Sequence, residues 1–186
     1  MPVTDLLKAK INQGFDHLDV DGDELLTEDD HVLMGKRVAK SLGHEPDSPS
    51  EQRIVDAYLR IWRDLHLPHI AGGGTAISRE QFLVSTGSLA DDPEAAAASV
   101  GALAEAFLAI ADVDAGGGVN PREFFLFQGG HFPDLTETEA AEAFAHLDTD
   151  GNGHLTAEEF IRACVQFWSS TDPAAPGNWW MGRLVE

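Results

Sequence analysis

The feature that most constrains this chain is a twelve-residue stretch near its C-terminus, Asp148–Glu159. Oxygen-bearing side chains occupy positions 1, 3 and 5 of the stretch (Asp148, Asp150 and Asn152), and a glutamate occupies position 12. Ca²⁺ takes six to eight hard oxygen ligands at about 2.3–2.6 Å, and a tight loop with this spacing, closed by a bidentate carboxylate at position 12, supplies them. Gly153 at position 6 permits the positive φ of the sharp turn. The pattern predicts a calcium-binding loop.

Helical patterns lie on both sides of this loop. Thr136 and Glu139 have the spacing of a capping box, and the apolar residues after them recur at helical intervals: Ala140, Ala143, Phe144 and Leu147. After the loop, Phe160, Cys164 and Phe167 form another helical stripe, which makes Cys164 a core residue rather than a nucleophile. A loop of this kind between two helices is an EF-hand.

Two further segments align with the loop but depart from it at single positions. In residues 112–123, Gly116 stands at position 5, so water must replace one side-chain ligand and we expect weaker binding. In residues 19–30, Glu24 replaces the glycine of position 6, and a non-glycine residue at positive φ costs on the order of 1–2 kcal/mol. Asp30 replaces the closing glutamate and is one methylene shorter, which favours a smaller coordination shell with mixed calcium and magnesium character.

A fourth segment, residues 70–81, keeps the register but has lost its ligands. Ile70, Gly72 and Gly74 at positions 1, 3 and 5 offer no side-chain oxygen. The helix before it is predicted to start at Ser48 and to run through Leu65. Position 8 of every loop is branched and apolar, and such residues can pair loops through short antiparallel bridges: Leu26, Ile77, Val119 and Leu155. We therefore expect the second unit to survive as a brace for the first.

These units predict an all-α protein of four EF-hands in two paired lobes that pack into one compact globule. The expected N-terminal pair covers residues 1–88, with loops 19–30 and 70–81. The C-terminal pair covers residues 93–170, with loops 112–123 and 148–159, and an aromatic tail covers residues 171–186. Trp179 and Trp180 in the tail are either a docking tag for a partner or a plug for the core, and we favour the plug because an exposed pair would be adhesive.

With a silent second loop and an aspartate closing the first, the sequence resembles the sarcoplasmic calcium-binding proteins, and within them the bacterial calerythrin-like EF-hand proteins. The resemblance implies about three Ca²⁺ ions, at hands 1, 3 and 4, with Mg²⁺ competing chiefly at hand 1. The ligands that it implies are, in hand 1, Asp19, Asp21, Asp23, Asp30 and the carbonyl of Leu25; in hand 3, Asp112, Asp114, Asn120, Glu123 and the carbonyl of Gly118; and in hand 4, Asp148, Asp150, Asn152, Glu159 and the carbonyl of His154.

Charge and composition restrict the partners. The 186 residues contain 12 Lys and Arg against 32 Asp and Glu, a net charge of −20, which opposes binding to nucleic acid or to an anionic membrane surface. The single cysteine allows no internal disulfide, no run of about 18 apolar residues is present, and the first residues lack the features of a signal peptide. We expect a cytoplasmic monomer whose partners are calcium ions. No Ser, His and Asp set has the context of a catalytic triad, so we expect no enzyme.

Two functions fit such sites. A buffer or transporter of calcium changes shape little, whereas a sensor opens a helix pair and exposes a methionine-rich groove to a target protein in bacterial calcium signalling. Of three methionines, only Met34 lies within a predicted helix, and the aromatic tail would fill the groove. Both features favour the intracellular buffer, and the sensor remains the alternative.

Overall fold

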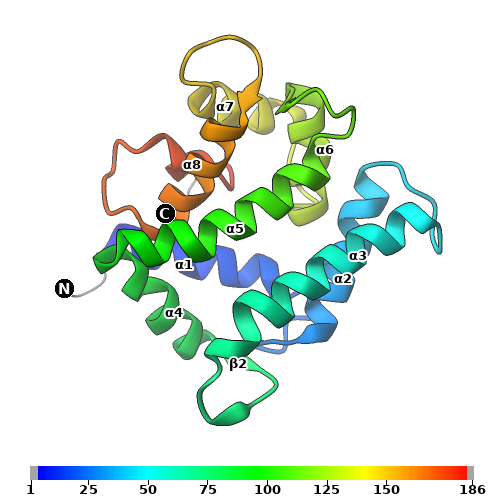
Figure 1. The fold of residues 1–186 in the computed structure, drawn as a ribbon. Helices are drawn as coiled ribbons and strands as arrows, with labels where there is room; N and C mark the ends of the chain where they lie inside the picture. The colour runs from blue at the N-terminus through cyan, green and yellow to red at the C-terminus, as the bar shows by residue number, and fades with distance from the viewer. Residues whose placement is uncertain (1–3, 184–186) are drawn as a thin grey trace.

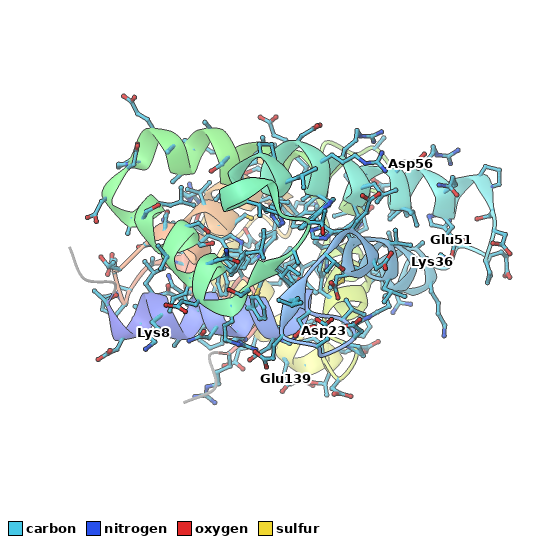
Figure 2. The ribbon with its side chains drawn as sticks, turned by 90° about the horizontal axis from the view of Figure 1, so that it is seen from below. Lys8, Asp23, Lys36, Glu51, Asp56 and Glu139 are labelled. Carbon is cyan, nitrogen blue, oxygen red and sulfur yellow. The ribbon has the colours of Figure 1, made fainter. Side chains whose placement is uncertain are left out.

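The computed structural model describes residues 4–183, which form eight α-helices arranged as four helix–loop–helix units (Figure 1). The helices are α1 (Asp5–Leu18) and α2 (Glu28–Ser41), α3 (Pro49–Ile61) and α4 (Arg79–Gly87), α5 (Pro93–Ala111) and α6 (Pro121–His131), and α7 (Glu137–Leu147) and α8 (Ala157–Ser169). The predicted all-α fold is confirmed. Charged side chains such as Lys8, Lys36, Asp56 and Glu139 project outward from it (Figure 2).

Short strands join the loops in two pairs. β1 (Leu25–Leu26) pairs with β2 (Ile77–Ser78), and β3 (Gly118–Val119) pairs with β4 (Leu155–Thr156), both antiparallel. The register places Leu26 opposite Ile77 and Val119 opposite Leu155. The position-8 residues thus form the bridges that the sequence predicts, and they carry their loops into the core, where Leu26, Val119 and Leu155 are fully buried.

Local capping signals set the helix boundaries. Ser48 and Thr136, the helix starts predicted from the sequence, accept a hydrogen bond from the backbone of the first turn of α3 and α7, and Asp92 does the same for α5. The expectation of one helix from Ser48 to Leu65 is wrong in detail, because α3 ends at Ile61 and continues as a π-helical turn, Trp62–His66, and a 3₁₀ turn, Leu67–His69. The physical reason is Pro68, which has no N–H to donate to an α-helical ladder.

The two lobes interlock through close contacts between helices. Trp168 of α8 lies against Gly14 of α1, where a Cβ would collide with the indole, and its ring makes an edge contact with Phe82 of α4. At Gly130 of α6, a Cβ would lie 2.5 Å from the Cα of Val38 in α2. Only glycine fits at these two positions, so the Trp168 ring can lie on the backbone of α1, and the backbones of α6 and α2 can approach each other.

Helix α5 crosses the middle of the molecule and packs along α8 (Figure 1). With 19 residues and a mean hydropathy of 1.5, it has the length and composition of a membrane span. From the sequence we expected no uninterrupted run of about 18 apolar residues. A third of that window is buried inside the protein, and Val100, Ala104 and Phe107 belong to its core. Apolar core helices have the same length and composition, so α5 is only weak evidence for a membrane span.

The C-terminal tail packs against the helices of the second lobe. Trp180 is 2% exposed, and its ring packs edge-on against Phe160 of α8 and Phe124 of α6, with ring centres 4.7 and 6.5 Å away. Trp179 is half-buried and stacks on His146. The interpretation of the tryptophan pair as a plug of the core is confirmed.

Lys10 anchors this tail to the rest of the molecule. Its ammonium group is fully buried and donates to the carbonyl oxygens of Gln166 and Ser170 at the end of α8, at 3.0 and 2.7 Å, and to Oδ1 of Asn178 in the tail, at 2.9 Å. Burial lowers the pKa of Lys10 to about 8. One side chain therefore joins the first helix, the last helix and the tail.

Candidate metal centre

Three of the four loops gather carboxylates. In each, one oxygen from each of three side chains lies within 4.8 Å of the other two: Asp19, Asp21 and Asp23; Asp112, Asp114 and Glu123; Asp148, Asp150 and Glu159. These three groups fall in the three loops that the sequence predicts to bind metal. Within the described residues 70–81 no such group is found, because that loop offers Ile70, Gly72 and Gly74 at the ligand positions.

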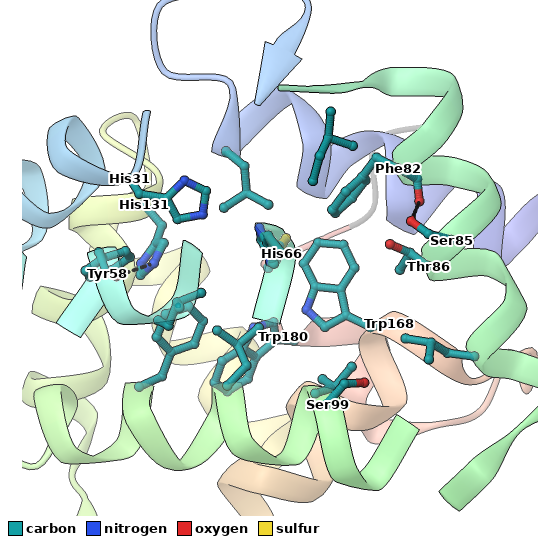
Figure 3. Close-up of a pocket in the computed structure, with 18 of the residues that line it drawn as sticks. His31, Tyr58, His66, Phe82, Ser85, Thr86, Ser99, His131, Trp168 and Trp180 are labelled. Carbon is teal, nitrogen blue, oxygen red and sulfur yellow. Dashed lines mark hydrogen bonds between the residues drawn. The ribbon is translucent and has the colours of Figure 1, made fainter. Parts of the chain in front are cut away.

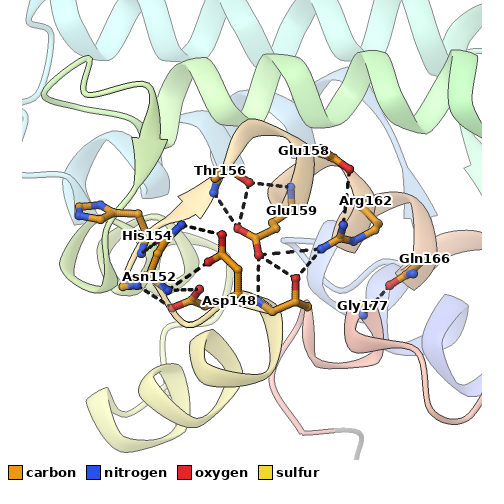
Figure 4. Close-up of polar contacts among 12 residues, drawn as sticks. Asp148, Asn152, His154, Thr156, Glu158, Glu159, Arg162, Gln166 and Gly177 are labelled. Atoms are coloured by element: carbon orange, nitrogen blue, oxygen red, sulfur yellow. Dashed lines mark hydrogen bonds and ion pairs between the residues drawn. The ribbon is translucent and has the colours of Figure 1, made fainter.

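The first aspartate of each of these three loops accepts hydrogen bonds from the backbone of its own loop. Oδ1 and Oδ2 of Asp148 accept hydrogen bonds from the backbone N–H groups of Asn152 and Gly153, at 3.1 and 2.9 Å (Figure 4). Asp112 accepts from Gly116 and Gly117 in the same way, and Asp19 accepts from Asp23 and Glu24. The backbone at position 6 has positive φ in all three loops: Glu24 68°, Gly117 85° and Gly153 85°.

The residue at position 12 ties the two ends of each loop together. One oxygen of Glu159 accepts from the backbone N–H of Thr149 at 2.9 Å, and the other accepts from that of Thr156 at 3.1 Å. Both threonine hydroxyls donate to it as well (Figure 4). Burial acts to raise the pKa of Glu159, but these hydrogen bonds outweigh it and lower the pKa to about 2. The closing side chain is thus a fixed carboxylate at neutral pH.

This arrangement is also a helix cap. Thr156 is the N-cap of α8 and Glu159 its third residue, and together they form a capping box. Positions 9 and 12 form capping boxes in the other loops too: Thr27 with Asp30, Ser78 with Gln81, and Asn120 with Glu123. Our sequence reasoning did not include this signal, although the four pairs share the same spacing. It explains why the second unit keeps its exit helix without its ligands.

Not every predicted ligand joins a cluster. The Asp30 carboxylate accepts hydrogen bonds from the backbone N–H groups of Val20 and Thr27, in the same way as the Glu159 carboxylate in its loop. It lies outside the group formed by Asp19, Asp21 and Asp23. This placement agrees with its shorter side chain. Asn120 uses Oδ1 to cap α6, accepting from the backbone N–H groups of Arg122 and Glu123 at 3.0 Å.

The remaining predicted ligands lie on the loop backbone or at its outer turn. Asn152 is exposed, and its side chain donates to Asp150 and accepts from the backbone N–H of His154. Leu25 and Gly118 begin β1 and β3, and His154 directly precedes β4. These three residues occupy position 7, whose backbone carbonyl is the expected ligand.

The donor sets fit a hard divalent cation. Each cluster offers oxygen atoms alone, without the sulfur or imidazole ligands that softer metals prefer. Three carboxylates within 4.8 Å also repel one another, and a dication between them relieves this repulsion.

One residue that supports the first loop was missed by sequence reasoning. Arg79, at the start of α4, forms ion pairs with Glu24 at 2.8 Å and with Asp16 at 2.7 Å, and its guanidinium lies 4.3 Å from the centre of the Phe15 ring. Glu24 is the residue with φ of 68° at the glycine position. The second unit therefore braces the first, as predicted, through a contact between residues 55 positions apart, which no local pattern signals.

Replacing this arginine is expected to destabilise the N-terminal pair. Arg79→Met removes two ion pairs and a cation–π contact, which together stabilise the fold by about 1–2 kcal/mol. Urea unfolding in saturating calcium measures the change. Arg53→Met, an equal charge change at an exposed site on α3, is expected to stay within about 0.5 kcal/mol of the parent protein. Equal stability of the two variants would show that Arg79 does not brace the loop.

Four paired helix–loop–helix units, three of them carrying carboxylate clusters, define an EF-hand protein of the calcium-binding class. The family model described as the EF hand domain matches residues 139–167, which span α7, the fourth loop and α8.

Whole-chain comparisons extend this likeness. Calerythrin of Saccharopolyspora erythraea is 26% identical over 168 residues, covering 88% of this chain and 93% of that protein. The luciferin-binding protein of Renilla reniformis is 28% identical over 179 residues, covering 95% and 93%. The calcium-loaded apo form of a coelenterazine-binding protein from Renilla muelleri superposes with a TM-score of 0.78 at 26% identity, covering 98% of this chain and all of that one.

A calcium-binding protein of Streptomyces coelicolor shares the fold, with a TM-score of 0.72 at 24% identity over 89% of this chain and 99% of that one. The chain is therefore similar to calerythrin over most of its length, and its fourth loop with the two flanking helices matches the EF hand domain.

Proposed function

We propose that this protein is an intracellular calcium buffer or transporter that binds about three Ca²⁺ ions, at hands 1, 3 and 4. The ligands are those named above for each loop, with Mg²⁺ competing at hand 1, where Asp30 lies outside the carboxylate group. The observation that carries the buffer assignment is the position of Trp180, which occupies the space between Phe124 and Phe160 on the two helices that leave loops 3 and 4.

A sensor works by opening such a space to a target. In sensor EF-hands, calcium separates the helices and exposes a methionine-rich groove. Here the Trp180 ring of the chain's own tail packs against both exit helices, and Gln128 holds the tail by donating to the carbonyl of Trp180 at 2.6 Å. Met34 is 1% exposed, so it offers no adaptable surface to a partner. Both features support a shape that changes little with calcium.

The charge of the protein supports the same assignment. Three bound Ca²⁺ ions would change the net charge from −20 to −14, since each brings two positive charges. A strongly acidic protein attracts cations and repels the anionic surfaces of nucleic acids and membranes. We therefore place it in the cytoplasm as a monomer.

An anionic hydrophobic dye, 8-anilinonaphthalene-1-sulfonate, tests the assignment. Its fluorescence with the protein is expected to stay flat or to fall when calcium replaces chelator, because no groove opens. Trp180→Ala is the positive control, since loss of the ring opens the space beside Phe160, and Trp179→Ala is its matched neighbour at a half-buried position. A marked calcium-dependent rise in the parent protein would instead support a sensor.

A further inference from the structure

A groove lies on the surface of the molecule between α3 and α5. Its volume is about 670 Å³, and residues between Ser50 and Asp64 line one side while residues between Ala102 and Val113 line the other. The two helices run side by side in opposite directions (Figure 1). This α3–α5 groove is distinct from the interior cavity that His31 and Trp168 line (Figure 3), because the two share only Ile61 among the described residues.

The lining of the groove is apolar, and the side chains that α5 contributes are mostly short. Ile54 and Ile61 of α3 and Ile110 of α5 supply the branched side chains. Three alanines extend this lining along α5: Ala102, Ala106 and Ala109. Val113 at the end of α5 is 53% exposed. Short side chains leave room for a further helix, because the distance between packed helix axes, about 8–10 Å, depends on the side chains at the contact.

Helix α5 is highly apolar for a helix that the rest of the molecule covers only in part. The window with a mean hydropathy of 1.5 is only one-third buried. A helix that is apolar on all sides is normally enclosed by protein or by lipid. The net charge of −20 opposes an anionic membrane surface. A protein surface is therefore the occupant that fits the uncovered side of α5.

Two arginines of α3 give the groove a cationic edge. Arg53 and Arg60 both line it, both are exposed, and within residues 4–183 neither forms an ion pair. Seven residues are close to two helical turns, so the two side chains leave the same face of α3, about 10 Å apart along its axis. Acidic side chains of a partner would complement this edge.

The other ionisable groups that line the groove leave these arginines free. The Asp112 carboxylate accepts hydrogen bonds from its own loop, from the backbone N–H groups of Gly116 and Gly117. Asp64 lies beyond the end of α3 and is exposed, and His44 adds positive charge when it is protonated. At physiological ionic strength the Debye length is about 8 Å, so the more distant acids of this protein act only weakly on a docked partner.

We propose that the α3–α5 groove docks an amphipathic helix of a partner protein, which places an apolar face against α5 and carries two acidic residues, seven positions apart, that pair with Arg53 and Arg60. A second copy of this chain does not supply such a helix, because none of the eight described α-helices carries two acidic residues seven positions apart. The groove is already open, so docking requires no separation of EF-hand helices and is independent of the proposed buffering.

Two synthetic peptides of equal composition test this spacing of charges. Each is a stapled helix of about 15 residues, which spans the distance of about 20 Å along the groove, and each carries a fluorescein label. Both are built from leucine, alanine, glutamine and two glutamates. In the first peptide the glutamates are seven positions apart beside the apolar face, and in its isomer one glutamate is moved to the opposite face. General repulsion by the acidic protein is the same for both, because their net charges are equal.

Fluorescence anisotropy measures the binding of both peptides to the calcium-loaded full-length protein in about 0.15 M salt. The first peptide is expected to saturate at one molecule per chain. Its isomer should bind about fivefold more weakly, since it can form only one of the two ion pairs. Equal binding of the two peptides by the parent protein would overturn the proposal.

Two exposed arginines give a matched pair of variants. Arg60 lines the groove, whereas Arg63 lies outside it and pairs with Glu28. Arg60→Gln is expected to weaken binding of the first peptide about twofold to fivefold, the range for one exposed ion pair, and Arg63→Gln to leave it unchanged. When Arg53→Gln is combined with Arg60→Gln, the preference over the isomer should vanish. A preference that survives in this double variant would show that the arginines do not read the acidic residues.

Two exposed alanines of α5 test the groove itself. Ala109 lines the groove, whereas Ala97 lies outside it. Ala109→Trp is expected to weaken binding of the first peptide about tenfold, because the indole fills the space of the docked helix, and Ala97→Trp to leave it unchanged. Absence of saturable binding, or equal binding by these two variants, would contradict docking at this site.

Sedimentation velocity of the unlabelled protein tests the other occupant, a second copy of the chain. The parent protein is expected to sediment as a monomer. A dimer that forms with rising concentration and disappears in Ala109→Trp would overturn the proposal, because a second copy would then occupy the groove. Calorimetric counting of calcium in each variant separates failure of the groove from failure of the metal sites.

Discussion

Removal of calcium by a chelator is expected to lower the melting temperature of this protein by on the order of 20 °C. The reason is the close packing of like charges, since three carboxylates converge within 4.8 Å in each of three loops. Bound ions stabilise the folded state by mass action, and their loss leaves the repulsion uncompensated. Differential scanning calorimetry in chelator and in millimolar calcium measures the shift.

Salt provides the control for this experiment. Chelator with about 1 M sodium chloride should recover part of the lost stability, because screening weakens the repulsion without supplying a ligand. Magnesium should recover more than sodium if loop 1 accepts it. A melting curve that is the same with and without chelator would contradict the assignment of the loops as metal sites.

Glu159→Gln is expected to weaken calcium binding at the fourth loop by about 100-fold, equivalent to about 2.7 kcal/mol. The substitution removes the closing charge and one of two oxygens from a side chain that four hydrogen bonds hold in place. Isothermal titration calorimetry should then show one fewer tight site, with the other loops retained.

The neighbouring glutamate is a matched control. Glu158→Gln makes the same chemical change on an 88% exposed side chain that forms an ion pair with Arg162 at 3.7 Å. It should leave the number of tight sites unchanged. If both variants bound calcium as the parent protein does, the fourth loop would not be closed by Glu159.

Much of the fold and of the candidate site could be predicted from the sequence, because the relevant signals are local. A loop of twelve residues contains its own ligands, its own glycine and the cap of its own exit helix. The pairing of Leu26 with Ile77 and of Val119 with Leu155 follows from one repeated position. Even the departure at Glu24 could be interpreted, since the structure places it at the expected positive φ.

The features that could not be predicted are contacts between distant residues. Arg79 meets Glu24 across 55 positions, and Lys10 meets Asn178 across 168. The cavity beside His31 depends on how two lobes with separate local patterns pack together. No spacing rule reports such contacts, because they arise when finished units dock on one another.

The anchoring of the tail by Lys10 has a consequence for how the protein is made. The partners of this lysine are Gln166, Ser170 and Asn178, which lie 156, 160 and 168 positions further along the chain and are therefore synthesised long after α1. Until these residues have been made, the Lys10 ammonium group lacks these acceptors, and the N-terminal half of the nascent chain cannot complete its packing. Docking of α1 against α8 therefore waits until residues 166–178 have been made, and a chain that stopped before residue 166 would leave the Lys10 ammonium group without these acceptors.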